Sequence, residues 1–110
     1  MPMILVETAV AAGAVNNNLV SGSAFEFART RQLVSIGVVQ SATGGFSTIT
    51  SGPDIIAEEF MVPILTTYPT IPDNMYFTDY MEQGDRLVIR YRNPTGGALT
   101  VRALVQTSPV

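Results

Sequence analysis

The segment that decides the fold runs from Gly84 to Gln106 and reads GDRLVIRYRNPTGGALTVRALVQ. Apolar and polar residues alternate from Arg86 to Arg92 and again from Leu99 to Gln106, and a period of two places successive side chains on opposite faces of a β-strand. Turn-forming residues fill positions 93–97 between them. The segment therefore predicts two half-buried strands joined as a β-hairpin. The side chains expected in the core are Leu87, Ile89 and Tyr91 in the first strand and Leu99, Val101, Ala103 and Val105 in the second.

The amino-terminal part of the chain continues the β pattern. Residues Met3 to Val10 are largely apolar and β-branched and predict a strand, and the small residues from Ala11 to Asn18 suit a connection or arm. The alternation from Ser23 to Arg29 predicts another half-buried strand. Its side chains are Phe25 and Phe27 on the core face and Glu26 on the opposite face.

The next stretch predicts an inner strand and a second hairpin. The β-branched run from Gln32 to Gln40 is typical of an inner strand, in which Gly37 marks a bulge or the close approach of another backbone. Turn residues at 41–45 and a further alternating stretch at 46–50 complete the expected hairpin over residues 32–50.

The signals that follow are weaker. Residues 54–62 fit either a strand or a short helix, with the strand favoured. From Ile64 to Gly84 we expect the longest irregular region, because Pro69 and Pro72 interrupt it. Loops on a rigid scaffold often carry binding specificity, so this region is the candidate ligand loop.

Taken together, the pattern predicts an all-β fold. Counting gives about seven to nine short strands separated by turn residues, as in an antiparallel β-sandwich of jelly-roll-like architecture. At 110 residues the chain is expected to form a single domain over residues 1–110, with a possible strand and arm at residues 1–18.

The composition argues against an enzyme. The chain has no histidine, cysteine, lysine or tryptophan, and these include the usual proton shuttles, covalent nucleophiles and soft metal ligands. The remaining carboxylates, hydroxyls and six arginines match no known catalytic pattern. We therefore expect no catalytic residue, no metal site and no cofactor.

Acidic residues near the irregular region are the one feature that could suggest a hard cation. They are Asp73, Asp79, Glu82 and Asp85. Their spacing matches no calcium loop, and aspartate beside turn residues commonly bonds to local backbone amides. The structural role is the favoured interpretation.

The charge balance bears on partners. A net charge of −3 gives no attraction for nucleic acid, and no apolar run is long enough for a membrane helix, so neither partner is expected. Arg29 with Arg31, and Arg86 with Arg90 and Arg92, are expected to form salt bridges with Asp or Glu. With 46% hydrophobic and only 14% charged residues, the chain favours contacts between subunits and hence a homo-oligomer.

Two surfaces are candidates for recognition. Edge strands of a sandwich must be blunted by charge or covered by a partner, and the first strand carries a single charge, Glu7. Its start is the candidate subunit interface. The residues are Met3, Ile4, Leu5 and Val6. The alternative is a carbohydrate-binding β-sandwich module, in which Tyr68, Tyr76 and Tyr80 of the ligand loop would stack on sugar rings.

The closing pattern from Gly84 to Gly97, followed by an alternating final strand, resembles the last hairpin of the small jelly-roll proteins that decorate or cement the capsids of tailed bacteriophages. The resemblance covers about the last 25 residues, and the rest only as a count of strands. It implies a non-enzymatic protein of the virion, assembled in the host cytoplasm and bound as an oligomer beside capsid proteins at the capsid surface. It assigns no role to an individual residue.

Overall fold

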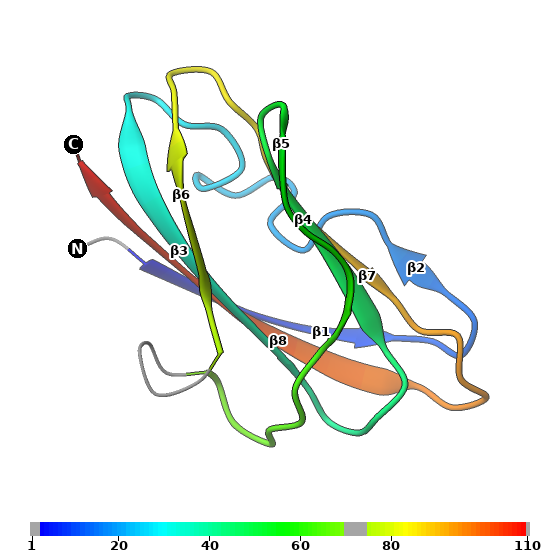
Figure 1. Cartoon of the computed structure of the whole chain (residues 1–110). Helices are drawn as coiled ribbons and strands as arrows, with labels where there is room; N and C mark the ends of the chain where they lie inside the picture. The colour runs from blue at the N-terminus through cyan, green and yellow to red at the C-terminus, as the bar shows by residue number, and fades with distance from the viewer. Residues whose placement is uncertain (1–2, 70–74, 110) are drawn as a thin grey trace.

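The computed structural model of the chain describes residues 3–69 and 75–109 (Figure 1). These residues form eight β-strands, and none of them lies in a helix that could span a membrane. The favoured strand at 54–62 is confirmed. The strands are β1 (Met3–Val10), β2 (Val15–Asn16), β3 (Gln32–Gln40), β4 (Phe46–Ser51), β5 (Asp54–Met61), β6 (Phe77–Met81), β7 (Leu87–Arg92) and β8 (Leu99–Pro109).

The strands form two four-stranded antiparallel sheets, in the orders β1-β8-β3-β6 (the first sheet) and β2-β7-β4-β5 (the second sheet). Four antiparallel pairs can be described as one long hairpin that is folded over into two sheets. They are β1–β8, β2–β7, β3–β6 and β4–β5. Rolling that hairpin brings β8 beside β3 and β7 beside β4, which is the arrangement of a jelly roll. The predicted antiparallel β-sandwich of jelly-roll type is confirmed.

The core lies between the two sheets, whose arrangement Figure 1 shows. The alternating residues of β7 and β8 that were expected inside are all buried. Burying each large apolar side chain of this kind contributes about 1.5–3 kcal/mol. The residues that β3, β4, β7 and β8 contribute are Val34, Ile36, Val38, Ile49, Leu87, Ile89, Tyr91, Leu99, Val101, Ala103 and Val105.

Both predicted hairpins are wrong in their connections. Strands β3 and β4 belong to different sheets, and so do β7 and β8. In each case the turn carries the chain across the sandwich, and two strands that face each other across a core show the same alternation as two paired strands. Asn93 holds the second crossing in place, because its buried Nδ2 donates to the carbonyl oxygens of Val10 and Gly97 at 3.0 and 2.8 Å.

The strand predicted from Ser23 to Arg29 is also absent. This segment is a series of turns, and its only β feature is an isolated bridge between Phe27 and Arg86. The faces are reversed as well: Phe27 is 54% exposed, whereas Glu26 is 8% exposed. Phe25 is half-buried against the core. Glu26 is inside because Arg86 Nε donates to its Oε2 at 2.7 Å, and Gly22 N donates to its Oε1.

The region expected to be irregular, residues 64–84, contains the edge strand β6. Its pairing with β3 from Gln32↔Met81 to Ile36↔Phe77 overrides the weak local signal. At Gly37, a Cβ would lie 3.2 Å from the Pro69 ring, so the glycine marks a close approach, although by a side chain and not by the backbone that was expected. The approaching group is a proline side chain of the segment after β5.

The alternation also assigns the side chains that point away from the core. On the first sheet the register places Met3 of β1, Leu104 of β8, Gly37 and Val39 of β3 and Tyr80 of β6 on one surface, which we call the outer face of the first sheet. The corresponding surface of β4 and β7, with Phe46, Val88, Arg90 and Arg92, is the outer face of the second sheet.

Candidate functional site

Strand β1 is an open edge of the first sheet. It pairs with β8 through eight consecutive residue pairs, from Met3↔Gln106 to Val10↔Leu99, and has no strand on its other side within the described residues. An unpaired edge of this kind presents free backbone N–H and C=O groups to another chain. Its one charge is Glu7, which pairs with Arg102 of β8 at 2.9 Å. No bulge or proline interrupts β1, so apart from Glu7 it has none of the usual protection.

The predicted interface residues divide between the two faces of β1. Ile4 and Val6 are half-buried and pack against the core. Met3 and Leu5 point to the outer face and are 54% and 44% exposed. Of the four, therefore, only Met3 and Leu5 offer side chains to another molecule.

The other long edge, β5, is blunted. Its pairing with β4 shifts register twice, between Ser47 and Ile49 and between Ile49 and Thr50. Glu59 has a φ of 47°, which is rare for a residue with a side chain. Asp54, Glu58 and Glu59 also place acidic side chains on this strand. Irregular geometry and charge both discourage pairing with another chain.

The outer face of the first sheet is partly covered by the segment at 62–69. Pro69 is buried over Gly37, and the Tyr68 ring lies 6.0 Å from Cζ of Arg102. Val39 is 1% exposed and Leu104 is 4% exposed, although both point away from the core. The covered part of this face is therefore a second, smaller apolar layer, and it borders the exposed Leu5, because Leu104 is the pairing partner of Leu5.

The three tyrosines of the predicted ligand loop do not form one platform. Tyr80 pairs with Leu33, whereas Tyr68 lies against Arg102, which pairs with Val39. These two positions on β3 are six residues apart in sequence, or about 20 Å along a strand. Arg31 also lies over the Tyr80 ring, 5.5 Å from its centroid. Tyr76 is 39% exposed and stands apart from both arginines in these stacking contacts.

Two of the four acidic residues considered for a cation, Asp85 and Glu82, have other partners within the chain. Asp85 Oδ2 accepts from Glu82 N at 3.0 Å and closes the turn before β7, which is the local role expected from the sequence. Glu82 pairs with Arg31 at 3.1 Å. Asp73 lies outside the described residues. Among the residues that the structure describes, no three metal-ligating side chains are grouped together.

Most arginines form the expected salt bridges. Arg31, Arg86, Arg90 and Arg92 each pair with a glutamate, and so does Arg102. The expectation is wrong for Arg29, which has no carboxylate partner among the described residues. The hydrogen bond from the Gly22 amide, followed by that from Arg86, lowers the pKa of Glu26 below its ordinary value. Glu26 is therefore a charged anchor for the turns at 21–29.

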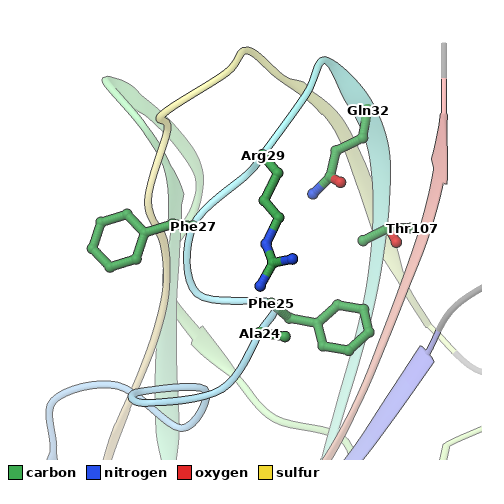
Figure 2. A pocket seen from close by; sticks show the side chains of 6 residues that line it. All are labelled: Ala24, Phe25, Phe27, Arg29, Gln32 and Thr107. Atoms are coloured by element: carbon green, nitrogen blue, oxygen red, sulfur yellow. The ribbon is translucent and has the colours of Figure 1, made fainter.

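A pocket of about 210 Å³ opens at the end of the sandwich, where β3 begins and β8 ends (Figure 2). Figure 2 shows the Arg29 side chain reaching down into it, with Phe25 at its base and Gln32 and Thr107 on the strand side. The Phe27 ring points away. The remaining lining residue is Ala24.

Sequence reasoning did not find this pocket. Its walls come from residues 24–32 and from Thr107, which are far apart in the chain, and the alternation at 23–29 predicts a strand and not a pocket wall. The one available signal was Arg29 next to two phenylalanines in a chain with few charges. Comparison of the chain with protein-family models, with curated proteins and with solved structures gave no match.

Proposed function

We propose that this chain is a non-enzymatic structural protein that assembles with copies of itself through β1, as a decoration or minor capsid protein of a phage shell would. Assembly is the part of the proposal that rests on geometry. The observation that carries it is the unprotected edge of β1, which contrasts with the blunted edge of β5.

The occupant of that edge is a second copy of the chain, with the two β1 strands antiparallel. Such a pair turns two four-stranded sheets into one continuous sheet and satisfies the free backbone groups of both edges. A strand of this length is about 27 Å long. On the outer face the pair also brings together Met3 and Leu5 of both copies, so that apolar surface leaves water.

The charge pattern is compatible with this pairing. Glu7 is the only charge on β1, and Arg102 of the same chain already neutralises it at 2.9 Å. Like charges directly opposite each other destabilise a strand pair. The two copies therefore avoid a register that places Glu7 opposite Glu7, and the ion pair weakens the repulsion in neighbouring registers.

The assignment to a virion rests on the resemblance of the closing segment and not on the geometry of β1. Viral capsid proteins use the jelly-roll fold, but lectin domains and cupins use it as well, and function does not follow from fold alone. The resemblance of the closing segment to phage decoration proteins favours the shell among these uses. A place at the capsid surface, beside capsid proteins, is the corresponding proposal for location.

The test is the mass of the native particle, measured by sedimentation or light scattering. We expect the unmodified chain to exceed the 11.8 kDa of one copy. Leu5→Glu should reduce the particle to a monomer, because it places a second charge beside Glu7 on the same face of β1. The matched control is Ile55→Glu, since Ile55 is 61% exposed on the other edge strand, β5. It should leave the mass unchanged.

Folding must be separated from assembly in this experiment. Deleting residues 1–15 would also remove Val10, which is 4% exposed, and the core contacts of Ile4 and Val6. The point substitution at Leu5 avoids this problem, and a cooperative urea transition confirms that the variant is folded. A monomeric unmodified protein, or equal loss of mass in both variants, would contradict assembly through β1.

The alternative, a sugar-binding module, has a separate test. Tyr76 is the tyrosine that stands clear of the arginine stacking contacts described above. Saturable glycan binding that disappears in Tyr76→Ala and persists in Tyr80→Ala would favour this alternative. Absence of binding on a glycan array would leave assembly as the better account.

A further inference from the structure

The pocket at the end of the sandwich has a chemistry that the assembly proposal does not use. Arg29 is the one arginine of this chain for which the described residues supply no carboxylate partner. The nearest acidic residue in sequence, Glu26, is already engaged by Gly22 and Arg86. Within the part of the chain that the structure describes, the positive charge that Arg29 brings to the pocket wall therefore has no counter-charge.

The other walls of the pocket add two hydrogen-bond donors to the Arg29 guanidinium. The Gln32 carboxamide and the Thr107 hydroxyl lie on the strand side of the pocket, and both groups can donate hydrogen bonds. Gln32 makes only a weak contact with a protein group, 3.8 Å from its Nε2 to Sδ of Met81. Phe25 adds an apolar surface at the base (Figure 2). Three donors of this kind beside one aromatic ring suit an anion attached to an apolar body.

The size of the pocket limits the ligand. Typical small-molecule sites measure about 300–1,000 Å³, whereas a cavity of about 150 Å³ holds a benzene molecule. At about 210 Å³, this pocket admits one ring or one side chain. A planar carboxylate matches the fork of an arginine, which can donate two parallel hydrogen bonds to it.

We propose that this pocket binds a carboxylate carried on a small apolar group. Arg29 pairs with the carboxylate, Gln32 and Thr107 donate to its oxygens, and Phe25 packs against the apolar part. The carboxylate comes either from a free small acid or from an acidic side chain of another protein chain. Neither source depends on the open edge of β1, so this inference stands apart from the proposed function.

The probe is sodium benzoate, titrated into the isotope-labelled protein and followed by the backbone amide signals of Phe25, Arg29, Gln32 and Thr107. We expect saturable shifts at these signals. Benzamide has the same shape without the charge, and it should bind about tenfold more weakly or not at all, because hydrogen bonds to a charged group are about twice as strong as neutral ones. Saturable shifts of equal size with benzamide, or no saturable shift with benzoate, would overturn the proposal.

A pair of variants localises the effect. Arg29→Gln should weaken benzoate binding about tenfold or more, whereas Arg31→Gln should leave it unchanged, because Arg31 pairs with Glu82 outside the pocket lining. Both side chains are exposed, so both variants should melt at the same temperature as the unmodified protein. Equal weakening in the two variants would refute a site at Arg29. Inorganic phosphate that competes as strongly as benzoate would refute the preference for a carboxylate.

Measuring the mass of the native particle distinguishes the two sources of the carboxylate. If another copy supplies an acidic side chain, excess benzoate and Arg29→Gln should each lower the mass of the assembled particle. If the ligand is a free acid, neither should change it. Leu5→Glu separates this inference from the assembly proposal, because a monomeric Leu5→Glu protein should still bind benzoate.

Discussion

The outer faces of the two sheets are built in opposite ways. On the second sheet, Arg92 lies over the Phe46 ring at 5.0 Å and pairs with Glu59 at 3.2 Å. Arg90 approaches the same glutamate at 3.8 Å. Charges and rings on this face find partners within the chain and remain in contact with water.

The outer face of the first sheet is apolar and depends on being covered. Val39 and Leu104 are almost fully buried there although they lie outside the main core, and the segment at 62–69 crosses this face. Towards β1 the cover ends, and Met3 and Leu5 are exposed. The comparison shows where a partner would bind. The side chains on the outer face of the second sheet find their contacts within the chain, whereas the apolar outer face of the first sheet is covered only in part.

The largest expected effect is a difference between the two faces in their tolerance of charge. Val39→Asp should destabilise the fold by about 3 kcal/mol or more, because it buries a carboxylate under the covering segment, and Arg102, its cross-strand neighbour, already pairs with Glu7. Val88→Asp makes the same change on the outer face of the second sheet, where Val88 is only half-buried. Val88→Asp should lower the free energy of unfolding by about 1 kcal/mol or less.

Urea denaturation of both variants gives the two free energies of unfolding. Equal losses would mean that the first sheet is no more covered than the second. A larger loss in Val88→Asp would reverse the comparison. Since neither residue lies on β1, the result does not depend on the state of assembly at that edge.

Which residues of each strand are buried could be predicted from the sequence, because alternation is a local property. The side chains of β7 and β8 expected in the core are there, and β1 has the predicted bounds. The connections could not be predicted in the same way. A turn such as residues 93–97 suits a hairpin and a crossing between sheets equally, and the contacts of Asn93 that decide between them reach Val10 and Ala11.

The segment at 23–29 shows a second limit. Its alternation is real, but Arg86 draws Glu26 inward, and backbone bonds such as Leu87 N to Glu26 O tie the turns to β7. Part of the candidate site could be predicted from the sequence, because a first strand with a single charge is a local signal. The pocket was not, because Arg29 and Thr107 meet only after β8 has returned beside β3.

A smaller effect concerns the interior that both sheets share. Burial raises the pKa of Tyr91 to about 12, from an ordinary value of 10.0. In the folded state the phenol therefore keeps its proton and donates to Gln40 Oε1 at 2.7 Å, while the unfolded chain ionises above pH 10. The contribution of Tyr91 to the free energy of unfolding is fully present below pH 10. Between pH 10 and 12 the free energy of unfolding should fall by about 1.4 kcal/mol per pH unit.

Tyr91→Phe is the control for this titration. It removes the titrating group together with one buried hydrogen bond, so it should cost about 1 kcal/mol at neutral pH. Above pH 10 its stability should depend less on pH than that of the unmodified protein. Parallel curves for the two proteins would show that Tyr91 is not the source of the alkaline loss.

The smallest effect is expected at the ion pairs of the second sheet's outer face. Glu59, Arg90 and Arg92 have side chains that are 44%, 40% and 36% exposed, so water and salt screen their attraction. Glu59→Gln should therefore cost less than about 1 kcal/mol, and the cost should shrink at high salt. Glu59→Gly removes the same charge but also relieves the strained φ of 47°. It should be at least as stable as Glu59→Gln. A glycine variant that is clearly less stable would mean that packing of the Glu59 side chain contributes more to the free energy of unfolding than its ion pairs do.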